Sequence, residues 1–179
     1  MRNDPYSRIY RASILSEVRR RLFEESFPRI KQCLETLPDE DIWYRPNDVS
    51  NSVGNLVLHI AGNLRQWILG GLGGQEDLRN RTQEFAERGP LPATQLLALL
   101  TRLEEEIDGL LDELSTEHLV ATYHIQAFRE TGISVLFHAV EHTAYHVGQI
   151  TYITKWRTET ETNYYGGIDL EEKNGGPVS

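Results

Sequence analysis

The sequence contains one cysteine, Cys33, so no disulfide can form within the chain. It also lacks an unbroken apolar run of about eighteen residues or more, the length typical of a membrane-spanning helix. The first residues, MRNDPYSRIYR, are polar and have no apolar stretch like that of a secretory signal. These absences predict a cytoplasmic protein that does not bind membranes and is stable without disulfides.

Positive charge is scarce. Lysine and arginine number 18 against 27 aspartates and glutamates, which leaves a net charge of −9 and a pI of about 5.1. Such a field repels nucleic acid and anionic membrane surfaces, so we expect a small-molecule substrate rather than either of these partners. A chain of 179 residues can bury one substantial core, and we predict a single domain over residues 1–179. Any metal would then serve function rather than folding.

The sequence has no Walker loop, no Rossmann fingerprint, no GxSxG elbow and no CxxC pair. It does have four long segments with apolar residues at helical spacing. The first runs from about Ser7 to Leu37 with a possible kink at Pro28. The expected starts of the other three are Ser50 or Ser52 as N-cap of the second, Thr94 as cap of the third, and Thr131 for the fourth, which ends near Trp156.

Two further segments complete the predicted architecture. Residues Leu119 to Arg129 alternate and are rich in β-branched and aromatic residues, which favours a short strand or an extended crossover before the last helix. The stretch from about 160 to 179 is polar, and we expect its end to be mobile. The predicted fold class is therefore all-α, a four-helix bundle with a short extended or β segment before the last long helix.

The fourth predicted helix carries three histidines at four-residue intervals in TGISVLFHAVEHTAYHVGQITYIT, with Glu141 as the one charged residue. This spacing places the imidazoles near one face of a helix. Eight residues of helix correspond to a rise of about 12 Å, so His138 and His146 cannot easily bind one ion together. The metal-binding pair would be His138 with His142, or His142 with His146, and the second lies closer to the apolar stripe.

His59 lies on the polar flank of the second predicted helix and is the natural third ligand. Three imidazole nitrogens suit zinc, nickel or a similar ion and leave a position open for water or substrate. The pattern does not favour a zinc protease, because Thr143 follows His142 where such enzymes need glutamate. The alternative is structural: these histidines could be satisfied by the backbone or by polar neighbours. We assign that role to His118 and His124, and a core position to Cys33.

The segments NLVLHIAGNLRQWI and HAVEHTAYHVGQI together resemble the DinB/YfiT-like superfamily of metal-dependent proteins, and within it an uncharacterised subgroup. The resemblance covers most of the chain. It implies a four-helix bundle, frequently a homodimer, with one histidine from the second helix and two from the fourth as metal ligands. Carried over to this sequence, the ligand set is His59, His142 and His146, and zinc or nickel is the expected ion.

The resemblance also implies an activity, a thiol-dependent S-transferase in which a low-molecular-weight thiol is joined to a small electrophile. The alternatives are a metal-dependent hydrolase and a non-catalytic bundle that binds metal or a partner. We see no basic cluster beside the histidines, because Arg65 points away from His59 on the helical wheel. The remaining candidates are Asn63 and Gln149 as partners of the ligand histidines, and Glu141, Tyr145 and Tyr152 as catalytic groups.

Overall fold

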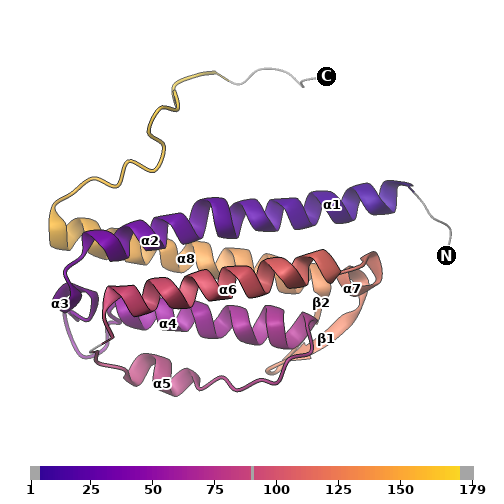
Figure 1. The fold of residues 1–179 in the computed structure, drawn as a ribbon, viewed down its shortest axis with the longest axis horizontal. Helices are drawn as coiled ribbons and strands as arrows, with labels where there is room; N and C mark the ends of the chain where they lie inside the picture. Colours follow the sequence, from indigo (N-terminus) through magenta and orange to yellow (C-terminus); the bar gives the residue numbers. More distant parts are fainter. Residues whose placement is uncertain (1–4, 90, 174–179) are drawn as a thin grey trace.

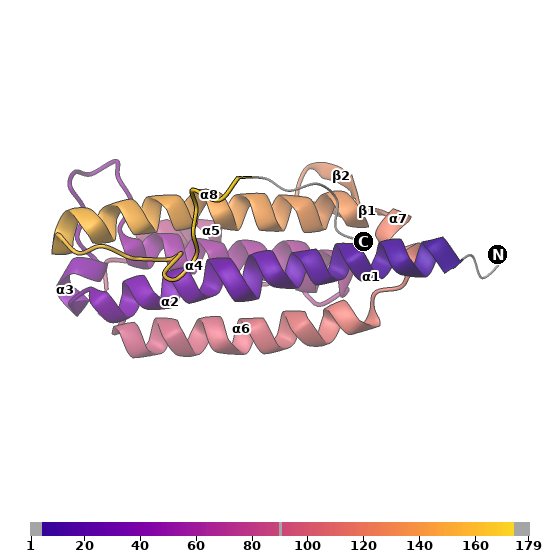
Figure 2. The same cartoon turned by 90° about the horizontal axis from the view of Figure 1, so that it is seen from above.

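The computed structural model describes residues 5–89 and 91–173, and within them four long helical units lie side by side (Figures 1 and 2). The first consists of α1 (Pro5–Arg19), the π-helical segment η1 (Arg20–Ser26) and α2 (Phe27–Thr36). The second consists of α4 (Val53–Leu64) and the π-helical segment η2 (Arg65–Leu72). The third and fourth are α6 (Ala93–Glu113) and α8 (Gly132–Thr158). The predicted all-α bundle is confirmed.

Pro28 does not break the first helix. Proline has no N–H to donate and its ring crowds the preceding turn, which disrupts a regular α-helix. Here the wider turns of η1 come immediately before it, and the N–H of Phe27 bonds to the carbonyl of Leu22, five residues back. The irregularity expected at Pro28 is therefore a local widening, and the helix continues to Thr36, where Leu37 turns into extended backbone.

The second helix begins at the second of the two predicted caps. Ser52 Oγ accepts a hydrogen bond from the N–H of Asn55, and Asn55 Oδ1 accepts one from the N–H of Ser52. This reciprocal pair satisfies two of the N–H groups that a helix start leaves free. The helix runs on through Gly70 and Gly71 and ends at Leu72. After it, a loop leads to the short α5 (Arg81–Ala86).

The predicted cap of the third helix, Thr94, is wrong. The helix begins at Ala93 after Pro92, and no side chain of the N-cap residue makes a capping bond. The N–H of Ala93 donates instead to Asp39 Oδ1, which belongs to the one-turn helix α3 (Asp39–Ile42). The carboxylate of Asp39 therefore caps the helix in place of Thr94. Residue spacing along the helix cannot predict a cap from a distant segment.

The expected extended segment is a hairpin of two strands, preceded by α7 (Thr116–Val120). Strand β1 (Thr122–Ile125) pairs antiparallel with β2 (Phe128–Thr131), and Ile125 faces Phe128 across the turn. Gln126, at the turn, has a φ of 55°, in the left-handed region that tight hairpin turns require. Thr131 then caps α8 by accepting from the N–H of Ser134, and the helix starts where the sequence predicted.

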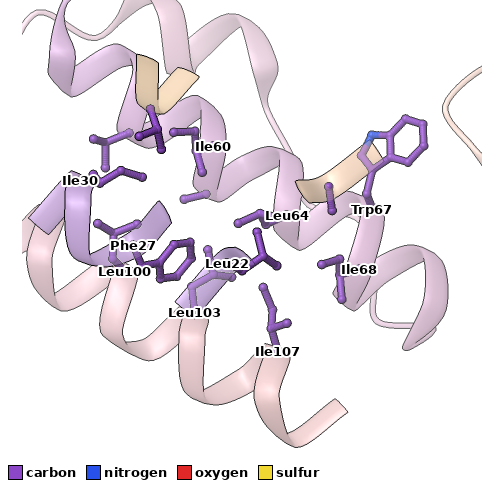
Figure 3. Close-up of a cluster of buried hydrophobic side chains, with 14 of the residues drawn as sticks. Leu22, Phe27, Ile30, Ile60, Leu64, Trp67, Ile68, Leu100, Leu103 and Ile107 are labelled. Carbon is purple, nitrogen blue, oxygen red and sulfur yellow. The ribbon is translucent and has the colours of Figure 1, made fainter. Parts of the chain in front are cut away.

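The core lies where the four helical units meet, and Figure 3 shows a cluster of its buried side chains. Side chains from η1 and α2 meet side chains from α4 and η2 on one side and from α6 on the other. All the labelled residues are buried, Trp67 at the edge of the cluster included. They are Leu22, Phe27, Ile30, Ile60, Leu64, Trp67, Ile68, Leu100, Leu103 and Ile107.

After α8 the chain folds back over α2. Gln32 donates to the carbonyl of Thr162, and the Tyr164 hydroxyl lies 3.3 Å from Cys33 Sγ and 2.7 Å from Thr151 Oγ1. Cys33 is 1% exposed, which confirms its predicted core position. The prediction of a mobile end falls in part on residues 174–179, which lie outside the described residues. Among the helices that are described, none has the length and apolarity needed to cross a membrane.

Candidate metal centre

The packing of α4 against α8 brings three of the predicted histidines together. One nitrogen from each of His59, His142 and His146 lies within 4.8 Å of the other two. His59 Nε2 and His142 Nε2 are 3.1 Å apart. His59 and His146 are 5% and 9% exposed, and His142 is half-buried. A buried group of three imidazoles this compact can hold one divalent ion, and three nitrogens leave a coordination position open.

His59 is held from behind by an ion pair. Its Nδ1 lies 2.9 Å from Glu84 Oε2, and Glu84 in turn accepts from Arg79 Nε at 2.7 Å and from Arg79 Nη2 at 2.9 Å. The side chains of His59, Glu84 and Arg79 are only 7%, 10% and 4% exposed. A carboxylate behind a ligand histidine fixes which ring nitrogen carries the proton.

The other two histidines differ in their support. His146 Nδ1 lies 2.7 Å from Gln149 Oε1, which leaves Nε2 as its accepting nitrogen. His142 Nδ1 is buried and has no hydrogen-bond partner in the described part of the chain. Its Nε2 faces His59 Nε2, and two lone pairs placed this close repel each other unless a proton or a cation lies between them. The donor set therefore fits a divalent ion held by His59, His142 and His146.

The electrostatics keep these groups in the protonation states that metal binding requires. Burial and the neighbouring His146 and His59 lower the pKa of His142 to about 3, and burial lowers the pKa of His146. Burial raises the pKa of Glu84, but hydrogen bonds from Arg79 and His59 outweigh it and leave that pKa below its usual value. At neutral pH His142 and His146 are thus neutral and Glu84 is ionised.

The lowered pKa of His142 predicts acid sensitivity of the metal-free protein. In the unfolded chain His142 has its ordinary pKa of about 6.5, whereas in the folded chain its pKa is about 3, so between these pH values only the unfolded chain binds a proton there. The free energy of unfolding should therefore fall as the pH drops through this window. Urea unfolding in chelator between about pH 7 and about pH 4 measures it, and His142→Gln should flatten the profile while the exposed His124→Gln should not. Identical profiles for wild type and His142→Gln would contradict the prediction.

His138 stands apart from the three-histidine group. Its ring stacks on Trp67 at 3.8 Å, and its Nε2 lies 3.4 Å from Asn63 Nδ2. The pair that joins His59 is therefore His142 with His146. Asn63, which we expected to support a ligand histidine, contacts His138 instead, and Asn63 Oδ1 has no partner among the described residues.

A pocket of about 420 Å³ opens beside His59 and His142. Aromatic side chains of Trp67, Phe128 and Phe137 form one part of its lining. The rest is polar and carries both signs of charge, from residues Asn63, Arg79, Arg81, Gln126, Glu130, Ser134, His138 and Glu141. A pocket with an apolar wall and a few convergent polar groups beside a metal centre is typical of a small-molecule site.

The three candidate catalytic groups do not share one pocket, because Glu141 lines the pocket beside His142 and the two tyrosines line another. Glu141 is exposed and lines this pocket. Tyr145 is 65% exposed, and its ring meets His146 edge-on at 5.0 Å. Tyr152 is 73% exposed and lines a separate surface pocket with Trp156. Of the three, Glu141 is the one that faces the pocket beside His142.

Sequence reasoning missed Arg79, Glu84 and Arg81. We expected no basic cluster beside the histidines, but Arg79 and Arg81 both line the pocket there. All three residues belong to the charged stretch between the second and third helices, where periodicity gives no signal. Asn80 does mark the start of α5, because its side chain accepts from the N–H of Gln83. That local pattern predicts a short helix, but not that Glu84 faces His59.

Solved structures with the same fold exist. The chain superposes on a DinB-like protein, YjoA, from Bacillus subtilis with a TM-score of 0.62 at 20% identity, over 83% of this chain and 94% of that one. A DinB-like protein from Bacillus cereus gives a TM-score of 0.61 at 17% identity, over 75% of this chain and 87% of that one. No curated protein matches. Fold and site thus define a DinB-like helical bundle with a candidate three-histidine metal centre.

The family follows from the sequence itself. Residues 11–165 match the family described as protein of unknown function (DUF1572), and the chain belongs to that family. The resemblance to DinB-like proteins is confirmed at the level of the fold.

Proposed function

We propose that this protein is a metal-dependent enzyme that transfers a low-molecular-weight thiol to a small electrophile. The observation that carries the proposal is the buried group of His59, His142 and His146 beside a pocket of molecular size. A zinc or nickel ion bound there would supply Lewis acidity that lowers the pKa of a thiol or water. S-transfer joins the thiol sulfur to an electrophilic carbon and releases the leaving group with the thiol proton.

The chain's own residues supply binding and orientation. Trp67, Phe128 and Phe137 offer an apolar wall for the electrophile. Arg81 is exposed at the pocket, with its guanidinium 5.0 Å from the Phe85 ring centre, and no carboxylate partner is recorded for it within residues 5–89 and 91–173. An arginine of the pocket lining with no carboxylate partner among the described residues would attract an anionic substrate group such as a carboxylate.

Two buried polar atoms of pocket residues also favour a bound small molecule. Asn63 Oδ1 and Trp67 Nε1 have no hydrogen-bond partner in the described part of the chain. Buried polar groups in proteins are usually paired, so an acceptor and a donor left over beside a pocket indicate partners supplied by water or ligand.

A hydrolase is the second candidate, because an ion held by the same three histidines would also lower the pKa of a bound water. Cys33 is buried in the core and lies against the Tyr164 hydroxyl, so in both candidate reactions the nucleophile comes from outside the chain, as a thiol or as water. Both activities use the same open metal position and the same pocket. They differ only in which nucleophile enters.

The test is turnover of fluorogenic electrophiles and esters by metal-loaded protein, with and without a panel of small thiols. We expect turnover that needs both thiol and metal and that stops with chelator. His146→Ala should abolish it, and His124→Ala, an exposed histidine on β1, should leave it unchanged. Turnover of esters without thiol would instead support the hydrolase. No turnover of either substrate class with the metal bound would refute both and leave a non-catalytic metal-binding bundle.

A further inference from the structure

Buried polar contacts hold the short helix α5 against α4. Asn55, which is fully buried, donates from Nδ2 to the carbonyl of Glu84 and to the carbonyl of Glu87, both at 2.9 Å. Asn55 lies one helical turn before His59 on α4. Its two bonds therefore fix the backbone of Glu84 beside that turn. Glu84 is therefore held in place independently of its side-chain interactions.

The carboxylate of Glu84 lies directly against the backbone of α4 at Gly62. A Cβ added at Gly62 would sit 2.0 Å from Glu84 Oε1 and 3.1 Å from Arg79 Nε. Any other residue at this position would collide with the ion pair. Gly62 follows His59 by three residues, which places the two on neighbouring parts of one helix face. The glycine thus provides the space through which Glu84 reaches His59.

Arg79 compensates the charge that this arrangement buries. Its Nε and Nη2 donate to the two oxygens of Glu84, and its Nη1 donates to Gln66 Oε1 at 2.9 Å. A two-pronged arginine contact of this kind also fixes the plane of the carboxylate. With the carboxylate plane fixed, Glu84 Oε2 is left facing His59.

His59 Nδ1 lies close to both a hydrogen-bond acceptor and a hydrogen-bond donor, and the two favour opposite protonation of this nitrogen. Glu84 Oε2 at 2.9 Å requires a proton on Nδ1, whereas Arg79 Nη2 at 3.1 Å could donate only to a lone pair there. The protonated form of Nδ1 is favoured, because the lone pair of an unprotonated Nδ1 would be repelled by the Glu84 carboxylate. Arg79 Nη2 does not need Nδ1 as an acceptor, since it already donates to Glu84. With the proton on Nδ1, the lone pair of Nε2 points toward His142.

We propose that Glu84, seated over Gly62 and held by Arg79, is a positioning residue that fixes the tautomer of His59 and thereby raises the affinity of the site for a divalent ion. The inference rests on the proposed metal site. It adds a residue whose influence passes through His59 and that touches neither substrate nor ion. His146 has only the neutral Gln149 in the corresponding place, so His59 is the ligand with the strongest support.

The experiment measures zinc affinity by competition with a chelating dye for the wild type, Glu84→Ala, Glu84→Gln and Gly62→Ala. Loss of a carboxylate behind a ligand histidine typically weakens metal binding by about 10-fold to 100-fold, and we expect this for Glu84→Ala. Glu84→Gln keeps an acceptor for Nδ1 and should lose less. Gly62→Ala retains Glu84 but displaces it and should lose affinity as well. Glu106→Gln, which removes a carboxylate from an exposed pair with Arg65, is the matched control.

A second readout needs no metal. Long-range proton–nitrogen NMR of the metal-free protein reports the tautomer of His59, which should carry its proton on Nδ1 in the wild type and shift toward Nε2 in Glu84→Ala and Gly62→Ala. Folded variants that keep both the tautomer and the zinc affinity of the wild type would overturn the inference. A wild type that takes up no zinc would refute the proposed function instead, and the tautomer measurement would still decide whether Glu84 orients His59.

Discussion

His59→Ala and His146→Ala are each expected to lose the bound metal, whereas the wild type purified without affinity tag or chelator should hold about one divalent ion per chain. Each substitution removes one of three nitrogens that lie within 4.8 Å of one another. Two imidazoles that remain are too few for a stable zinc or nickel site in competition with water and buffer. Mass spectrometry with inductively coupled plasma measures the metal content directly.

His138→Ala is the informative control for this experiment. It removes a histidine from the same helix, one turn from His142, but its ring stacks on Trp67 outside the three-histidine group. The variant should keep its metal. Loss of metal in His138→Ala with retention in His146→Ala would mean that His138 and His142 form the pair. A wild type that contains no metal and takes up neither zinc nor nickel would assign all these histidines a structural role.

Phe27→Ala is expected to cost the largest amount of folding free energy. The ring is fully buried at the start of α2, meets Phe23 edge-on at 5.7 Å, and lies in the core between α4 and α6 (Figure 3). Truncation of a buried phenylalanine to alanine typically removes about 3–5 kcal/mol, because apolar contacts are lost and a cavity remains. Urea unfolding followed by circular dichroism measures the difference.

Phe137→Ala makes the same chemical change at a site that is 65% exposed on α8. Substitutions at such positions usually change stability by about 0.5 kcal/mol or less. A similar loss for both variants, or a loss below about 1 kcal/mol for Phe27→Ala, would mean that the core does not pack as described.

Most of the fold was predictable because the sequence signals of a helix lie within a few residues of one another. Apolar residues at helical spacing marked all four long helices, and local capping chemistry set the start of α4 at Ser52 and of α8 at Thr131. The errors occurred where a distant group replaced a local one. Asp39 caps α6 in place of Thr94. The short strand or extended crossover expected before α8 is a two-stranded hairpin.

The candidate site divides in the same way. The four-residue spacing on α8 limited the possible ligand pairs to two, and the sequence resemblance selected His142 with His146. In the structure these two, and not His138, meet His59. The contact of His59 with Glu84, 25 residues away, could not be predicted from the sequence pattern, because α5 lies in a charged stretch without periodicity.

The sequence by itself determined the helices, their polar seams and the histidines available to one ion, because these follow from contacts within a few residues. Only the tertiary structure decided which side chains stand behind those histidines and what lines the pocket. The loop before α5 and α5 itself bring Arg79, Arg81 and Glu84 to the site, and the missing side chain of Gly62 leaves space for the Glu84 carboxylate. Such long-range placements depend on how whole elements pack, and no local pattern of residues encodes them.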